Sequence, residues 1–154
     1  MSIPSLFVLM FVIGALVVGG IGMRIVVRAR KSTAWPAVSG QVTHSEITRS
    51  GSGEGGPSYS ALIRYSYTVG GQSLTSERIA FGLSNMSAGH GFAKAYTNRY
   101  PVGTSVDVHY DPAVPSEAVL EPGVSKRAFI PLAFAGGFLI FAGWFGLLYW
   151  LFRL

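Results

Sequence analysis

Two long apolar stretches stand at the ends of this 154-residue chain, and a mostly polar sequence lies between them. The first stretch is Ile3–Met23 and the second is Ala128–Phe152, and neither contains Asp, Glu, Lys or Arg. An α-helix rises about 1.5 Å per residue, so about 20 apolar residues cover the hydrocarbon core of a bilayer. The pattern predicts transmembrane helices over residues 3–27 and 128–152. Between them it predicts one β-rich domain, residues 32–127, whose two ends leave the same face of the membrane.

Alternation of apolar and polar residues dominates the first half of this central segment. Residues Val38–Ile47 alternate loosely, and Tyr59–Val69 alternates almost perfectly, which is typical of a strand with one buried face. Gly70-Gly71 supplies the positive φ angles of a tight turn, so Gln72–Ala80 is predicted to return as the partner strand.

The second half contains one amphipathic stretch and two short strand patterns. Asn85–Arg99 is predicted to be a helix that ends before Pro101, while Ser105–Tyr110 and Glu117–Glu121 are predicted strands. The fold class predicted is therefore a membrane α+β protein. Two transmembrane helices flank a small antiparallel β-sheet or partly closed β-barrel of about five strands with one short helix.

The net charge of +5 is concentrated beside the apolar stretches. Between Ser32 and Ser125 the sequence has five basic and seven acidic residues, so the central domain itself is mildly acidic. No basic stripe is available to follow a phosphate backbone, and we expect no nucleic-acid partner. The chain contains no cysteine, which excludes disulfides and thiolate ligands, and no motif indicates a cofactor.

The basic residues also predict the orientation of the chain. Six of them lie at the inner flanks of the two stretches, and one, Arg153, lies at the outer ends. By the positive-inside rule we expect the β-domain to be cytoplasmic and both termini to lie outside, in a multi-pass protein of the bacterial plasma membrane. A cleaved signal peptide is disfavoured because no Lys or Arg precedes Arg24 and the apolar run exceeds 20 residues.

Side chains suited to the membrane interface follow from these boundaries. They are Arg24, Arg28, Arg30, Lys31, Trp35, Lys126, Arg127, Trp144 and Trp150. Three small-xxx-small pairs predict close helix contacts, namely Ala15 with Gly19, Ala133 with Gly137, and Ala142 with Gly146.

Motifs that could carry chemistry are few. Gly51–Gly56 matches G-x-G-x-x-G, but a strand follows it where a dinucleotide site needs a helix, so we interpret it as a hairpin loop. Asp107, His109 and Asp111 share one face of a predicted strand and form a weak candidate metal site. Asp111-Pro112 is equally typical of a turn whose aspartate bonds to backbone N–H groups. Asn85–Ser87 matches a glycosylation sequon, and no Ser/His/Asp constellation is evident, so no catalytic residue is assigned.

Three segments of the chain, taken in order, resemble a known family. They are Trp35–Val42 (WPAVSGQV), Arg64–Gly71 (RYSYTVGG), and the pair Tyr100–Pro112 (YPVGTSVDVHYDP) with Ala118–Gly123 (AVLEPG). In these features the chain is similar to the bacterial family known as domain of unknown function 3592. The resemblance implies a small membrane protein with no catalytic residues to carry over.

The shared positions are those expected to shape turns, strand ends and the core. They are Trp35, Pro36, Gly40, Tyr65, Tyr67, Gly71, Tyr100, Pro101, Gly103, Tyr110, Asp111 and Pro112.

Three functions remain open from the sequence. The favoured hypothesis is a non-enzymatic binding or assembly module whose partners are the bilayer and a membrane protein or further copies of the chain. The alternatives are a membrane-surface metal-dependent hydrolase acting through His109 and a small transporter or channel accessory subunit. The last is the weakest, since neither apolar stretch carries the ionisable residues that line most permeation paths.

Overall fold

The computed structural model describes residues 3–50, 57–83 and 90–152, which form two compact units. The helical unit comprises Met1–Val27 and Lys126–Leu154, and the sheet unit comprises Arg28–Ser125. The predicted Gly51–Gly56 loop, the first residues of the predicted Asn85–Arg99 helix, the Asn85–Ser87 sequon and Arg153 lie outside the described residues.

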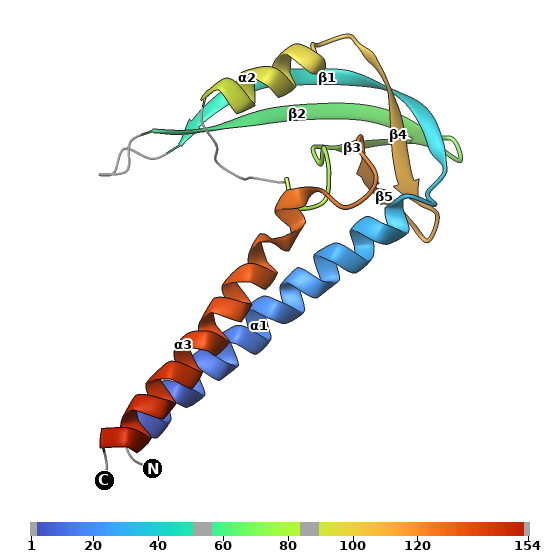
Figure 1. Cartoon of the computed structure of the whole chain (residues 1–154). Coiled ribbons are helices and arrows are strands. Elements are labelled where there is room, and N and C mark those ends of the chain that lie inside the picture. Colours follow the sequence, from blue (N-terminus) through green and yellow to red (C-terminus); the bar gives the residue numbers. More distant parts are fainter. Residues whose placement is uncertain (1–2, 51–56, 84–89, 153–154) are drawn as a thin grey trace. The chain divides into compact units, whose positions relative to one another are not determined.

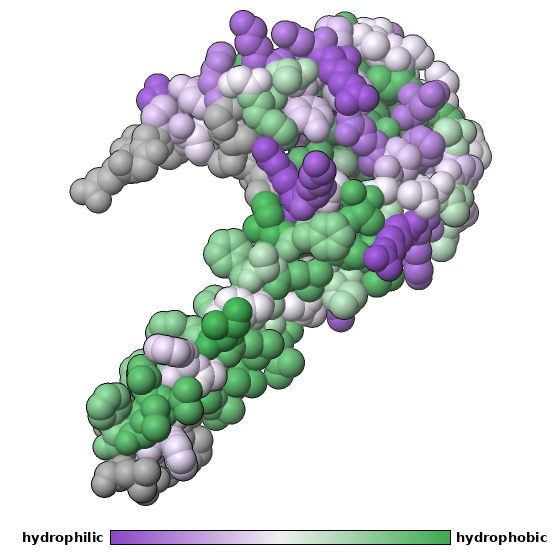
Figure 2. Space-filling view, viewed as in Figure 1, coloured by the Kyte–Doolittle hydropathy of each residue, from purple (hydrophilic) through white to green (hydrophobic). Residues whose placement is uncertain are grey.

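The helical unit is built from α1 (Ile3–Ser32), which continues into the sheet unit, and α3 (Ile130–Phe152), which follows a short 3₁₀ turn, η1 (Lys126–Phe129). Among the described residues these are two helices long and apolar enough to cross a membrane, with mean hydropathies of 2.6 and 1.9. The surface of both helices is largely apolar (Figure 2).

Small residues let the two helices approach one another. A Cβ at Gly19 would lie 3.4 Å from Cβ of Ala135, and one at Gly22 would lie 3.1 Å from Leu132. Ala15 is buried, which confirms the predicted contact of Ala15 and Gly19. The prediction was wrong for the second pair, Ala133 and Gly137, because both residues are exposed on the outer side of α3.

The two residues of the third predicted pair, Ala142 and Gly146, lie on different sides of α3. Ala142 is buried at the helix contact, whereas Gly146 has open space where its Cβ would stand. An aromatic contact, Phe11 with Phe141 at 4.8 Å between ring centroids, adds to the packing of the helices.

The sheet unit contains five antiparallel strands in the order β3-β2-β1-β4-β5 (Figure 1). Their bounds are β1 Ala37–Ser50, β2 Ser58–Val69, β3 Gln72–Ser76, β4 Ser105–Asp111 and β5 Val114–Val119. Gly70 and Gly71 have φ angles of 57° and 81°, as the predicted turn between β2 and β3 requires. The predicted fold class is thus confirmed as two long apolar helices flanking a five-stranded antiparallel sheet with one short helix.

Two strand predictions were wrong at their ends. β3 stops at Ser76 instead of Ala80, because the chain turns away there and the carbonyl of Ile79 accepts the N–H groups of Leu120 and Glu121. β5 begins at Val114, immediately after a two-residue turn, and does not reach Glu121.

The core lies on the concave face of the sheet. The short helix α2 (His90–Arg99) covers one end of it, over β1 and β2, and buries Ala93 completely (Figure 1). The buried side chains of this cluster are Val42, Ile63, Tyr65, Tyr67, Ile79, Tyr100, Val108, Ala118 and Leu120. The predicted inward faces of β2 and β4 are confirmed by Ile63, Tyr65, Tyr67 and Val108.

Tyrosine hydroxyls link the two edges of this open sheet, where β3 and β5 do not pair. The Tyr65 hydroxyl lies 2.8 Å from the carbonyl oxygen of Arg78 and 3.1 Å from that of Ala118. The Tyr67 hydroxyl donates to the carbonyl of Pro115 at 2.7 Å, and the Ser76 hydroxyl donates to that of Ala118. Side chains therefore replace the backbone ladder that would close a barrel, and edge carbonyls of β5 are satisfied by them.

Strand β1 bends at two specialised positions. An extra residue, Thr43, separates the pairs Val42–Tyr65 and His44–Arg64, so Ser45 faces the core and His44 does not. A Cβ at Gly40 would stand 2.7 Å from both the Ser66 carbonyl oxygen and a Val108 methyl group. Only glycine fits this close crossing of three strands.

Candidate functional site

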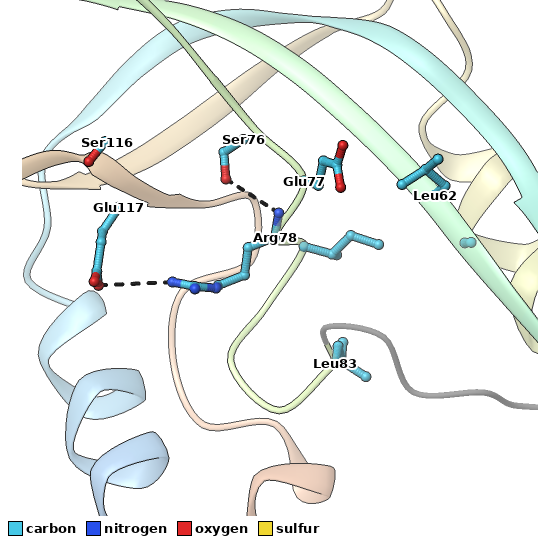
Figure 3. Close-up of a pocket in the computed structure, with 9 residues that line it drawn as sticks. Leu62, Ser76, Glu77, Arg78, Leu83, Ser116 and Glu117 are labelled. Carbon is cyan, nitrogen blue, oxygen red and sulfur yellow. Dashed lines mark hydrogen bonds and ion pairs between the residues drawn. The ribbon is translucent and has the colours of Figure 1, made fainter.

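The sheet unit has a polar cleft of about 250 Å³ at the point where β3 ends (Figure 3). One wall is Ala61 and Leu62 of β2, and the opposite wall is Ser116 and Glu117 of β5. The end of β3 and the turn after it supply the remainder, namely Ser76, Glu77, Arg78, Ile79 and Leu83. Two hydroxyls, two carboxylates and a guanidinium thus surround a space with an apolar side.

The charged groups around the cleft are paired across elements. Arg64 holds Glu77 through two hydrogen bonds of 2.8 and 2.6 Å. Arg28, in the last turns of α1, holds Glu117 at 3.0 Å, and Arg78 lies 3.9 Å from the same carboxylate. Arg28 and Arg64 thus neutralise the two carboxylates of the lining from beside the cleft, and these five charged groups together carry one positive charge in excess.

Arg78 carries this excess charge most directly. Its guanidinium is only one-third exposed, and Glu117, its partner at 3.9 Å, is already bound by Arg28 at the shorter distance. The guanidinium also stands 5.2 Å from the ring centroid of Phe81, and the backbone N–H of Arg78 donates to the Ser76 hydroxyl. These contacts position the side chain while leaving donors available to an additional acceptor.

The tyrosines of the core are held in their neutral form. Burial raises the pKa of Tyr65 well above its ordinary value, and burial together with the hydrogen bond to Glu121 raises the pKa of Tyr100. Burial also raises the pKa of Tyr67. These hydroxyls act as hydrogen-bond donors that fix the framework of the site.

The weak candidate metal ligands do not form a ligand cluster. Within residues 3–50, 57–83 and 90–152, no three His, Asp or Glu side chains come together to hold a metal ion. Asp111 accepts the backbone N–H of Ala113 at 2.9 Å, which confirms its interpretation as a turn residue. His109 places Nδ1 3.4 Å from the carbonyl oxygen of Trp35.

The residues predicted for the membrane interface lie in different environments. Trp35 is partly buried and its ring meets Phe81 edge-on, with 5.8 Å between centroids. Trp144 and Trp150 of α3 are each 63% exposed. Arg24, Arg30 and Lys31 are exposed on α1, and Lys126 is exposed at the start of η1. Arg28 differs from these because it is bound to Glu117.

Several positions of the predicted family pattern have clear structural roles. Gly103 has a φ of 86°, and its N–H donates to the Val42 carbonyl, so it shapes the connection into β4. Pro101 follows the end of α2, and Pro36 offers its carbonyl to the N–H of Tyr110. Tyr110 is only partly buried at the rim of the core.

Sequence reasoning missed the cleft itself. Arg78 and Glu117 are far apart in the chain, and the alternation of Gln72–Ala80 gave no sign that the strand ends at Ser76. The one available signal was the charged pair Glu77-Arg78 within an otherwise weakly polar stretch.

Comparison with known proteins identifies the sheet unit with one family. The model of a family described as "Domain of unknown function (DUF3592)" matches residues 38–125, which is more than half of the chain. No curated protein and no solved structure matches the chain.

Proposed function

The chain belongs to the DUF3592 family, and we propose that it is a non-enzymatic membrane protein that holds a binding domain at the bilayer surface. The helical unit would be the anchor, and the sheet unit would bind a partner. The cleft at the end of β3 is the observation that carries the proposal.

Composition supports the anchoring part of the proposal. Both long helices expose large apolar side chains, and each is long enough to cross a hydrocarbon core. Six Lys and Arg residues flank the sheet unit and one lies at the outer ends, which favours a cytoplasmic sheet unit in the plasma membrane.

The geometry of the cleft supports the binding part. Ligand sites combine apolar walls with a few well-positioned polar groups, and this cleft has Leu62, Ile79 and Leu83 beside Arg78 and two serines. Its charged groups are held by salt bridges and hydrogen bonds from three different elements, so they are arranged before any partner arrives.

Anchoring and orientation are tested with reporters on the intact chain. Because the protein has no cysteine, Ser105→Cys gives a single exposed thiol in the sheet unit. We expect this thiol to resist a membrane-impermeant maleimide in intact cells and to react after lysis. An alkaline phosphatase fused at Leu154 should be active, and labelling of the introduced thiol in intact cells would overturn the orientation.

Partner binding is tested by purification of the full chain in a mild detergent. Ser116→Trp would fill the cleft, whereas Ala95→Trp places the same ring at an exposed position of α2 away from the cleft, as a matched control. We expect a protein that co-purifies with the wild type and the control to be lost from Ser116→Trp. Equal recovery from all three forms, or a bare monomer in each, would refute the proposal.

A further inference from the structure

Within the part of the chain that the structure describes, one side of strand β2 has no neighbouring strand over part of its length. β3 pairs with β2 from Val69 to Tyr65 and ends there, while β2 runs on to Ser58, and the only described strand paired with it there is β1. We call residues Tyr59–Leu62 the open edge. Ala61 and Leu62 of this edge form a wall of the cleft, and Figure 3 shows the chain turning away from Leu62 after Ser76.

The direction of the backbone groups at the open edge follows from the hairpin. A two-residue turn makes Val69 and Gln72 a hydrogen-bonded pair, so odd-numbered residues of β2 direct their N–H and C=O groups toward β3. Even-numbered residues face β1, and the hydroxyls of Thr43 and Thr48 donate to the carbonyls of Arg64 and Ser60 on that side.

The N–H and C=O groups of Tyr59 and Ala61 therefore point away from β1, into the place that a longer β3 would occupy. Among residues 3–50, 57–83 and 90–152, no hydrogen bond reaches these four groups from that side. Natural edge strands are commonly protected by proline, lysine or a bulge, and Tyr59–Leu62 contains none of these devices.

Space for another strand adjoins the open edge. The polar cleft shares Ala61, Leu62, Ile79 and Leu83 with a smaller cavity of about 70 Å³. This second cavity is completed by Thr48, Ser60, Phe92 and Tyr96, so it is mainly apolar. A strand laid along the edge would thus meet a small apolar cavity near one end and Arg78 near the other.

We propose that the open edge accepts an extended segment of a partner protein as an added strand, with an acidic side chain of that segment bound by Arg78. This inference deepens the proposed function and rests on it, since it assigns a binding mode to the same cleft. Backbone hydrogen bonds to Tyr59 and Ala61 supply the affinity, and the apolar cavity and Arg78 supply the specificity.

The charges around the cleft favour an acidic segment of a partner protein as the added strand. Arg28 and Arg64, beside the cleft, already bind the carboxylates of Glu117 and Glu77, so a carboxylate of the added segment is the matching partner for Arg78. A second copy of the chain, paired edge to edge, would bring a second positive excess to the interface. Such a dimer is therefore an opposing outcome of the test.

Amide hydrogen exchange on the full chain in detergent tests the open edge without any substitution. We expect the amides of Tyr59 and Ala61 to exchange at least ~100-fold faster than those of Ser60 and Leu62, which are bonded to β1. Slow exchange of all four amides in the isolated chain, whether in a monomer or a dimer, would overturn the proposal.

A selection of random nine-residue peptides displayed on phage, with the full chain in nanodiscs as bait, tests the occupant. Selected peptides should contain Asp or Glu and should slow exchange at Tyr59 and Ala61. Ala61→Pro removes a donor only from the open side and should weaken their binding at least tenfold, while the exchange pattern of Ser60 and Leu62 verifies that β2 still pairs with β1.

Arg78→Gln separates charge from backbone pairing. Replacing the acidic residue of a selected peptide by its amide should reduce binding to the wild type, because Arg78 loses its partner. The same replacement should not change binding to the Arg78→Gln variant. A selection that yields no peptide sensitive to Ala61→Pro would overturn strand addition. If Ser116→Trp still blocks the co-purifying protein in that case, the proposed binding function survives and only its mode is wrong.

Discussion

The two units of this chain bury opposite kinds of side chain. In the helical unit the buried positions are small apart from Val26; Ala15 and Ala142 are examples, while Leu16 is 70% exposed and Ile140 is 76% exposed. In the sheet unit Tyr65 and Val108 are completely buried, and the exposed positions are mostly polar. The two units therefore differ in the size of the side chains that they bury.

The difference is the one expected when the helical unit lies in lipid, as proposed, and the sheet unit lies in water. In water, burial of large apolar side chains is the main source of stability, so the sheet unit places them in its core. In a hydrocarbon environment a leucine gains little by leaving lipid for protein, and helices associate through close contact of small residues.

Alkaline pH should separate the two units most strongly. Tyr65, Tyr67 and Tyr100 have a raised pKa in the folded sheet unit, whereas unfolded tyrosines ionise near pH 10. Their contribution to stability is complete below about pH 10 and is lost as the pH rises further, because the unfolded chain releases these protons first.

Circular dichroism across an alkaline titration should show loss of the β-sheet signal while the helical signal persists. Absorbance would follow ionisation of the phenols in the same samples. Ionisation of all seven tyrosines of the chain before any loss of the sheet signal would contradict this explanation.

A charge on the outer side of α3 should be the most costly single substitution. Ile140→Arg replaces the most exposed isoleucine near the middle of the helix, and an arginine there disfavours membrane insertion by about 3 kcal/mol. The measurement is the fraction of chain that resists carbonate extraction. Val102→Arg, at a 61% exposed position of the sheet unit, should leave this fraction unchanged.

Filling the space at Gly40 should be the next largest effect, confined to the sheet unit. In Gly40→Ala the added methyl group meets the Ser66 carbonyl and Val108 at 2.7 Å, and we expect a loss of about 2 kcal/mol in unfolding free energy. Gly91→Ala is the control, since that helical position has open space and alanine should stabilise it slightly. Equal stability of the two variants would argue against the crowding at Gly40.

Removing one hydroxyl should loosen the link between the sheet edges. Tyr65→Phe leaves the carbonyls of Arg78 and Ala118 without this donor, and we expect a loss of about 1.5 kcal/mol in thermal unfolding experiments. Tyr110→Phe, at the rim of the core, is the comparison and should cost less. A Tyr65→Phe protein as stable as wild type would show that the edges are held by other contacts.

The exposed salt bridges should matter least for stability. Arg28→Gln breaks a pair whose arginine is 58% exposed, and such pairs contribute less than about 1 kcal/mol. Arg99→Gln breaks a similarly exposed pair with Glu121 and should behave alike. A much larger loss for Arg28→Gln would mean that this contact holds the end of α1 in place.

Local pattern was sufficient to predict most of the fold. The two apolar helices, the β2–β3 hairpin with its glycine turn and the inward face of Tyr65 and Val108 all follow from composition and alternation over a few residues. These features depend on neighbours in sequence, where hydrophobic periodicity and turn chemistry are reliable.

The features that define the cleft depend on contacts between distant segments. β3 ends at Ser76 because the carbonyl of Ile79 accepts hydrogen bonds from the N–H groups of Leu120 and Glu121. The sequence pattern within Gln72–Ala80 does not indicate these hydrogen bonds. Arg28, Arg78 and Glu117 likewise meet only after the strands are arranged. The metal hypothesis relied on the spacing of Asp107, His109 and Asp111 along one strand. In the structure the Asp111 carboxylate instead accepts a hydrogen bond from the backbone N–H of Ala113 in its own turn.

The extra residue in β1 makes the length of this strand, and not only its composition, essential. With Thr43 in place, Ile47 faces the core while His44 and Glu46 pair with each other in solvent at 3.2 Å. Deleting Thr43 would leave these faces unchanged, because the pairs Val42–Tyr65, His44–Arg64 and Ser45–Ile63 would then follow one another without a break. Inserting one residue after Ser45 would instead exchange the two sides for the residues that follow. We therefore expect the deletion of Thr43 to be tolerated better than the insertion after Ser45.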